Sequence, residues 1–168
     1  PAYGDSIIVG SIGDASNLIP FLATDSASHQ IADLVYNGLV KYDKDLNIVS
    51  DLAESWDDTP DGVTITFRLR KDIRFHDGTP CTVDDVLFTF HTILDPKVPS
   101  AYKEDYLRVK KIQKIDSNTF RVFYDEIYAP ALISWGALSV LPSHLLKNVN
   151  VTKSPLTRSP VGTGPYRF

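Results

Sequence analysis

The sequence lacks several features that would assign its class directly. Cys81 is the only cysteine among 168 residues, so no disulfide can form within the chain. No apolar run approaches the roughly 20 residues that a membrane-spanning helix needs. The formal net charge is −4, which is not the basic excess that nucleic-acid binding normally uses. We therefore expect no intrachain disulfide, no membrane span and no nucleic-acid partner.

Residues that bind metals or catalyse reactions are also sparse. The four histidines have neither the i, i+4 spacing nor the HExxH pattern of a zinc site, and no CxxC motif accompanies them. Adjacent carboxylates at 57–58 and 84–85 point in different directions from one strand or helix, so they cannot flank a substrate. There is no GxSxG motif. We expect no metal and no cofactor, and a hydrolase using Asp14 or His76 is the enzymatic alternative.

What is present is an ordinary globular composition, with 43% apolar and 23% charged residues. Residues 63–70 alternate apolar and polar side chains, which predicts a strand with one buried face. Asp61-Gly62 before it is typical of a turn. Residues 83–94 place apolar side chains at helical spacing, and Thr82 with Asp85 predicts a capping box at the start of that helix. A short strand at 73–75 and a second turn at 76–80 lie between them, so the unit is strand, turn, strand, turn and capped helix.

The rest of the chain predicts further short elements. We expect strands at 7–10, 73–75 and 166–168, a hairpin within 39–49, and an antiparallel pair at 109–115 and 120–124. Helices are expected from Ser26 or Ser28 to a left-handed stop at Asn37-Gly38, and at 131–138 and 142–147, with Trp135 as a buried anchor. Residues 148–160 are interpreted as a polar linker. The predicted fold class is α+β, with a mixed, mainly antiparallel sheet and a few short helices.

Several short motifs, in order along the chain, carry a resemblance to a known family. They are Tyr36-Asn37-Gly38-Leu39, Leu52-Ala53-Glu54-Ser55-Trp56, Phe75-His76-Asp77-Gly78-Thr79-Pro80, Asp85-Val86 and Gly162-Thr163-Gly164-Pro165-Tyr166. Together with the strand at 64–70, this set resembles the family 5 extracellular solute-binding proteins, the receptors of peptide and nickel ABC importers.

The resemblance implies a two-lobed architecture of the type II periplasmic binding proteins. Residues 1–38 would form the N-terminal edge of domain I, residues 39–159 the small lobe inserted into it, and residues 160–168 a return strand into domain I. The rest of domain I and the opposing lobe would lie outside this chain. We therefore expect an N-terminal portion of a larger receptor, which would bind ligand weakly by itself because half the contacts are missing.

The resemblance also implies a function and a site. The receptor would capture a peptide-like ligand between its lobes and deliver it to the permease subunits of an ABC importer, in the periplasm or at the cell surface after removal of a signal. The loop of Asp14, Ala15 and Ser16 would pair with the ligand's backbone, a form of strand addition. Tyr102 would offer a ring and a hydroxyl at the cleft, with Tyr106 as the alternative if the loop register shifts.

Two questions stay open at this point. The ligand can be a peptide, an oligosaccharide, a nickel or other metal chelate, or another small solute. The alternative function is a free-standing α+β module that binds a partner protein and has no transport role.

Overall fold

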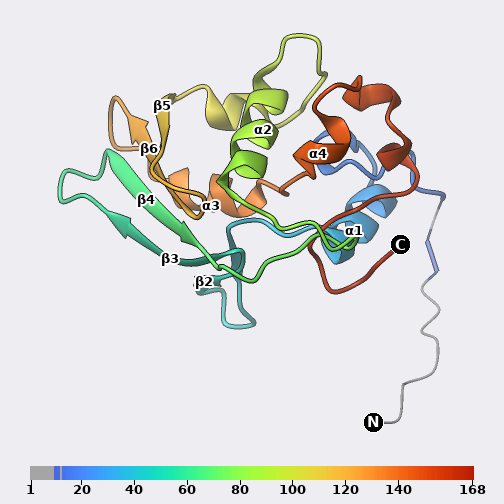
Figure 1. Ribbon diagram of the computed structural model, residues 1–168, viewed down its shortest axis with the longest axis horizontal. Helices are drawn as coiled ribbons and strands as arrows, with labels where there is room; N and C mark the ends of the chain where they lie inside the picture. The colour runs from blue at the N-terminus through green and yellow to red at the C-terminus, as the bar shows by residue number, and fades with distance from the viewer. Residues whose placement is uncertain (1–9, 12) are drawn as a thin grey trace.

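The computed structural model describes residues 10, 11 and 13–168, and shows helices packed on one face of an antiparallel sheet (Figure 1). Its strands are β1 (Val40–Tyr42), β2 (Ile48–Ser50), β3 (Ala53–Asp58), β4 (Thr64–Leu69), β5 (Val109–Lys114) and β6 (Thr119–Tyr124). Its α-helices are α1 (Ser26–Val35), α2 (Val83–Leu94), α3 (Ala131–Ala137) and α4 (Ser143–Leu146). Short 3-10 turns lie at Pro20–Leu22, Lys103–Tyr106, Val151–Lys153 and Pro155–Thr157.

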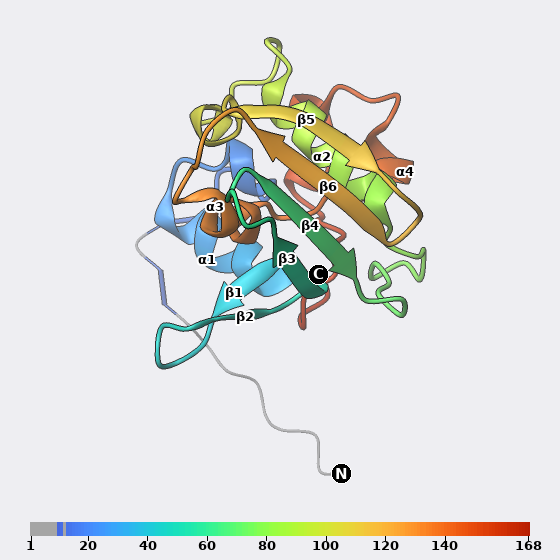
Figure 2. The ribbon, with the colours of Figure 1, turned by 90° about the vertical axis from the view of Figure 1, so that its left-hand side faces the viewer.

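The main sheet has the strand order β3-β4-β6-β5, and every neighbouring pair is antiparallel. Figure 2 views its outer face, with α2 behind it. The predicted alternation holds on β4, where Ile65, Phe67 and Leu69 are buried. Gly62 leads into this strand with φ of +69°, a left-handed conformation that glycine adopts without strain. The predicted hairpin is also present as the separate antiparallel pair β1-β2.

An aromatic cluster forms the centre of the core, and Trp135 of α3 lies in its middle. Its ring is fully buried and stacks on Phe90 of α2 with centroids 5.7 Å apart. Phe67 and Phe120 of the sheet approach the same indole with centroids at 5.9 and 5.8 Å. The indole N–H donates to the hydroxyl of Tyr124 at 2.9 Å, so its one polar group is satisfied. The predicted role of Trp135 as an anchor is confirmed.

Helix α2 begins as the sequence predicts. Thr82 and Asp85 form a capping box. The Thr82 hydroxyl accepts a backbone N–H of the first turn of α2, and the Asp85 carboxylate accepts the backbone N–H of Thr82. Asp85 also accepts the N–H and the hydroxyl of Ser143 at 3.0 and 2.7 Å. One carboxylate therefore caps α2 and holds the start of α4 against it.

The limits of α1 differ from the prediction. Its N-cap is Asp25 and not Ser26 or Ser28, because the Asp25 carboxylate accepts the N–H of Ser28. The helix stops with Tyr36 in an extended conformation, and Gly38 has no positive φ, so the predicted left-handed stop is wrong. Glycine is needed at position 38 for another reason. A Cβ there would lie 1.6 Å from the carbonyl oxygen of Gly136, so the backbone of α3 occupies that space.

Other predicted elements also need correction. Residues 73–75 form no strand and make only a single bridge between Arg74 and Pro80. Residues 166–168 are not a strand, and β3 lies where no strand was predicted. Residues 148–160 are not a solvated linker, because they form two 3-10 turns that bury Val151 and Leu156. The strand predicted at 7–10 lies, apart from its last residue, outside the described residues.

The C-terminal segment runs beside α1 (Figure 1). The N–H groups of Gly164 and Tyr166 donate to the carbonyls of Val35 and Leu34 at 2.7 and 3.1 Å. The two segments predicted to be edges of domain I are therefore neighbours in space. The domain limits themselves remain a prediction.

Candidate ligand-binding site

The loop that carries Asp14, Ala15 and Ser16 is held against the start of α1. The Asp25 carboxylate accepts the hydroxyl of Ser16, and the same Asp25 oxygen accepts the Ser16 N–H at 3.4 Å. The carboxylate also accepts the hydroxyl of Ser28 at Oδ2, 2.7 Å away, and the N–H of Ser28 at its other oxygen, Oδ1, 2.8 Å away. The hydroxyls of Ser16 and Ser28 are the main reasons that the pKa of Asp25 is held well below its usual range. Asp25 therefore stays ionised while it caps α1 and holds the loop.

The same loop is held from its other side by the C-terminal part of the chain. The guanidinium of Arg158 donates to the carbonyl of Ala15 at 2.7 Å. The N–H of Leu18 donates to the carbonyl of Thr157 at 2.9 Å. Asp14 and Ser16 nevertheless remain exposed. The loop is therefore an exposed polar segment that the N-cap residue of α1 and the C-terminal part of the chain hold at Ala15, Ser16 and Leu18.

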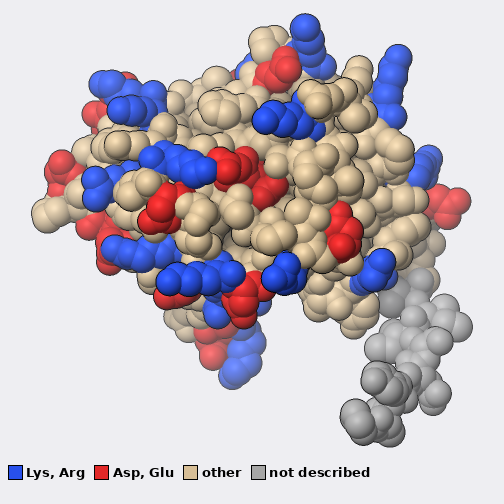
Figure 3. Space-filling model, in the orientation of Figure 1, with Lys and Arg blue, Asp and Glu red and all other residues tan. Residues whose placement is uncertain are grey.

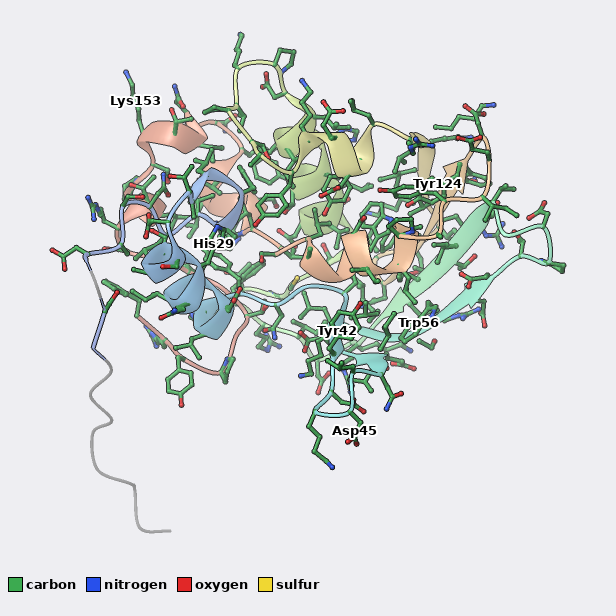
Figure 4. The ribbon with its side chains drawn as sticks, turned by 180° about the vertical axis from the view of Figure 1, so that it is seen from behind. His29, Tyr42, Asp45, Trp56, Tyr124 and Lys153 are labelled. Atoms are coloured by element: carbon green, nitrogen blue, oxygen red, sulfur yellow. The ribbon has the colours of Figure 1, made fainter. Side chains whose placement is uncertain are left out.

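Tyr102 directly precedes the 3-10 turn Lys103–Tyr106 and contacts α1 at His29. Its half-buried ring meets the ring of His29 edge to face, with centroids 6.4 Å apart. Both residues line a cavity of about 550 Å³ between α1, the β1-β2 hairpin and α3. His29 on α1 and Tyr42 on β1, two residues of this lining, are labelled in Figure 4. We call this space the α1 cavity.

Tyr106 also borders the α1 cavity, but its side chain is packed and hydrogen-bonded within the hydrophobic core. Its side chain is 1% exposed, and its hydroxyl donates to the carbonyl of Ser134 at 2.7 Å. Its ring meets Trp135 edge to face. Tyr102 is therefore the better placed of the two tyrosines to meet a ligand.

The structure places the Asp14–Ser16 loop and Tyr102 against the same helix, α1, but these two parts of the predicted site do not contact each other. Ser16 reaches the N-terminus of α1, and Tyr102 meets the next turn at His29. Asp14, Ala15 and Ser16 are not part of the lining of the α1 cavity. Among the described residues no hydrogen bond joins this loop to Tyr102.

Sequence reasoning missed the residues that hold this site in place. Asp25 directly precedes Ser26-Ala27-Ser28, and an aspartate at that place was a usable capping signal. Arg158 gave no signal, because its partner lies 143 residues away in the sequence. His76 belongs to one of the short sequence motifs, and its ring binds the C-terminal segment. The N–H of Gly162 donates to Nδ1 at 3.3 Å, so Nε2 carries the proton that it donates to the Gly164 carbonyl at 2.8 Å.

Charges on the surface are mixed in sign. Figure 3 shows Lys and Arg interspersed with Asp and Glu on the face that it views. Within residues 10, 11 and 13–168, no group of three or more His, Cys, Asp or Glu side chains is arranged to hold a metal ion. Over the same residues, no helix combines the length and the apolar character needed to cross a membrane.

Comparison with known proteins by a family model and by sequence identity points to the same family. The family described as bacterial extracellular solute-binding proteins, family 5 Middle, matches residues 47–168. The oligopeptide-binding protein AppA of Bacillus subtilis is 31% identical, with 100% of this chain and 32% of AppA covered. The chain thus spans about a third of the length of the curated relatives that it matches.

Solved structures agree with the sequence comparison. The ABC transporter substrate-binding protein CtaP of Listeria monocytogenes superposes with a TM-score of 0.88 at 31% identity, covering 98% of this chain and 34% of CtaP. NikZ of Campylobacter jejuni, in complex with Ni(L-His), gives a TM-score of 0.84 at 29% identity over 93% of this chain and 31% of NikZ. The predicted two-lobed architecture is therefore that of the structures to which this chain is similar.

Proposed function

Because this chain belongs to the family 5 bacterial extracellular solute-binding proteins, we propose that it is part of a receptor that captures a peptide-like solute between two lobes and delivers it to an ABC importer. The observation that carries the proposal is the match over nearly the whole chain to receptors of this kind, one of which, AppA of Bacillus subtilis, is solved with a nonapeptide. The family members are binding proteins, which also favours a receptor over a free-standing interaction module.

The fixed loop supports a peptide-like ligand in particular. An extended peptide presents backbone N–H and C=O groups along its whole length, so any exposed, rigid stretch of protein backbone can pair with it. Asp14 and Ser16 are exposed on such a stretch, which Asp25 holds at Ser16 and Arg158 holds at Ala15. A rigid loop loses little conformational entropy when the ligand binds. This small entropy loss on binding is the physical reason to assign ligand contact to Asp14, Ala15 and Ser16.

The proposal includes the division of the chain and its location. Residues 1–38 and 160–168 would belong to domain I, and residues 39–159 to the small lobe. The hydrogen bonds from Gly164 and Tyr166 to α1 support this division, since they join its two outer parts. Ligand contacts shared by two lobes imply closure about a hinge, and the protein would work outside the cytoplasm with the membrane subunits of its importer.

Thermal unfolding of the natural protein with synthetic peptides of two to nine residues tests this function. A ligand at 100 times its dissociation constant stabilises the folded state by about 2.7 kcal/mol, which raises Tm by several degrees. We expect such a shift with peptides and none with the nickel-histidine chelate. The reverse pattern would contradict a peptide-like ligand, and no shift with either would contradict the proposed function.

Tyr102→Ala tests the site within the same assay. The substitution removes an aromatic face from the cleft, so we expect peptide affinity to fall about tenfold or more. Ile127→Ala is the matched control, because Ile127 is 72% exposed and lies outside the α1 cavity. Equal affinities of the two variants would remove Tyr102 from the site.

A further inference from the structure

We propose that the α1 cavity is a subsite for a cationic side chain of a peptide ligand, and that Asp33 supplies the opposing charge. The inference rests on the proposed function and adds a preference among peptides. It assigns a binding role to a space that Asp14, Ala15 and Ser16 do not line.

Asp33 is the acidic residue on which the subsite depends. It lies on α1, four residues after His29, and both side chains line the cavity. Residues four apart share one face of a helix, so Asp33 follows His29 on the side of α1 where His29 meets Tyr102. Its carboxylate is exposed, and no ion pair of the described residues includes it. Asp33 therefore brings to the cavity a negative charge that the described residues do not balance.

The other two charged side chains of the lining, Lys41 and Asp51, balance each other. The Lys41 ammonium lies 3.2 Å from the carboxylate of Asp51, whose side chain is only 14% exposed. The second oxygen of Asp51 accepts the amide of Asn37 at 2.9 Å. With His29 neutral, the lining therefore keeps one negative charge in excess, that of Asp33. Such a charge attracts a cation, and the attraction strengthens when closure of a cleft excludes water.

The walls of the cavity suit the apolar stem of a long cationic side chain. Its volume of about 550 Å³ lies within the range of small-molecule sites, about 300–1,000 Å³. Ile133 is 45% exposed and Tyr42 is 49% exposed, so apolar and aromatic surface is open at the lining. Lysine and arginine pack their stems on apolar surface and keep the charged head in a polar environment. The face of an aromatic ring also attracts that head. An apolar wall with one carboxylate therefore matches both halves of such a side chain.

Hydroxyl groups of the lining offer further acceptors. Among the described residues, no hydrogen bond involves the hydroxyls of Tyr42, Tyr102 or Ser139. An ammonium has three N–H donors and a guanidinium has five, and neither group accepts. These oxygen atoms can receive the donors that the Asp33 carboxylate does not. An acidic side chain would instead meet a like charge at Asp33, which disfavours it.

The test uses the natural protein and alanine pentapeptides that carry one changed residue at position 2, 3 or 4. The changed residue is lysine, glutamate or norleucine, which keeps an apolar stem without the charge. At one of these positions we expect calorimetric affinity in the order Lys, norleucine, Glu, with the Lys peptide about 10- to 30-fold tighter than the norleucine peptide. Equal affinities of the Lys and norleucine peptides at all three positions would overturn the subsite while leaving peptide binding intact. Failure of every peptide to bind would contradict the proposed function itself.

Two variants assign the effect to Asp33, and a third is their control. Asp33→Asn removes the charge and keeps the size, so the advantage of Lys over norleucine should fall to about 2- to 5-fold, the share of the aromatic rings. Asp33→Lys reverses the charge, and the Glu peptide should then bind more tightly than the Lys peptide.

Asp58→Asn is the control for the change in net charge, and it should preserve the full order. Asp58 is an exposed residue of β3 that lies outside the α1 cavity, and no ion pair of the described residues includes it. A full Lys advantage in Asp33→Asn, or a Lys preference that survives Asp33→Lys, would overturn the assignment. An equal loss in Asp58→Asn would overturn it as well, because overall charge would then explain the preference.

Discussion

At the scale of single residues, Asp25 links the start of α1 to the proposed site. Its carboxylate caps α1 and holds the loop of the proposed ligand contacts through Ser16. Because these donors favour the ionised form, the folded-state pKa of Asp25 lies below its unfolded value of about 3.9. The stabilisation from these bonds is complete above that unfolded value. It diminishes as the pH falls below it, and it is gone once the pH has fallen through the folded-state pKa.

Asp25→Asn tests this linkage. At pH 7 we expect a lower Tm than in the wild type, because the amide accepts these hydrogen bonds more weakly than a carboxylate does. The Tm difference between the two proteins should shrink between pH 5 and pH 2, measured by circular dichroism. Asp45→Asn, an exposed turn residue whose change leaves the loop alone, serves as the control. A Tm difference that stays constant with pH would show that the charge of Asp25 has no part in holding the loop.

Whether a residue's partners lie near it in the sequence decides whether its role could be predicted from the sequence. Thr82, Asp85 and Trp135 were predicted correctly, because a cap is defined by residues three apart and a buried indole by its apolar neighbours. The structural roles of Arg158 and His76 were not found. Arg158 binds a backbone group 143 residues away in the sequence, and His76 binds backbone groups 86 and 88 residues away. The predicted ligand contacts at Asp14, Ala15, Ser16 and Tyr102 came from a resemblance to a family, and they stay predictions until a ligand is measured.

At the scale of elements, two glycines set the contact between β1 and α3. Gly38 and Gly136 lie so close that a Cβ on Gly38 would meet the carbonyl of Gly136, and a Cβ on Gly136 would lie 2.8 Å from the carbonyl of Val40. Sequence reasoning assigned Gly38 to a left-handed turn, because glycine is the usual residue there. The need for close approach depends on a partner about 100 residues away, so no local pattern could show it.

Gly38→Ala should therefore destabilise the protein strongly. The obstacle is backbone, which cannot rotate away as a side chain can, so we expect a loss of about 1–3 kcal/mol or more in the free energy of unfolding. Urea denaturation measures this loss. Gly13→Ala is the matched control, since nothing lies within 4 Å of a Cβ built there. If both variants unfold at the same urea concentration, the close packing of β1 on α3 does not limit stability.

The start of α2 gives a second prediction at this scale. Thr82→Ala removes one half of the capping box and should cost about 0.5–2 kcal/mol. Asp85→Ala should cost more, because the same carboxylate also accepts from Ser143 at the start of α4. Equal losses in urea denaturation would mean that the contact with α4 contributes nothing. A larger loss in Asp85→Ala would show that one side chain positions two helices.

For the whole molecule, the central question is what joins the C-terminal segment to the rest of the chain. His76 provides one such connection, because both nitrogens of its ring bind the backbone of Gly162 and Gly164. Its own N–H also donates to the Gly162 carbonyl at 2.9 Å. Beside it, His144 Nε2 lies 2.7 Å from a carboxylate oxygen of Asp77. The bonds of His76 fix the path of the C-terminal segment toward α1, where Gly164 and Tyr166 donate to the carbonyls of Val35 and Leu34.

His76→Phe should loosen this connection without emptying the space that the ring fills. Two hydrogen bonds to the ring are lost, so we expect a destabilisation of about 1–3 kcal/mol and a Tm lower by several degrees. Amide exchange measured by mass spectrometry should be faster at residues 162–166, while the core strand β4 keeps its protection. His91→Phe is the control, because His91 lies exposed on α2 away from this segment. If exchange at 162–166 is unchanged in His76→Phe, the segment is held by its bonds to α1 alone, and the histidine ring does not help to hold it.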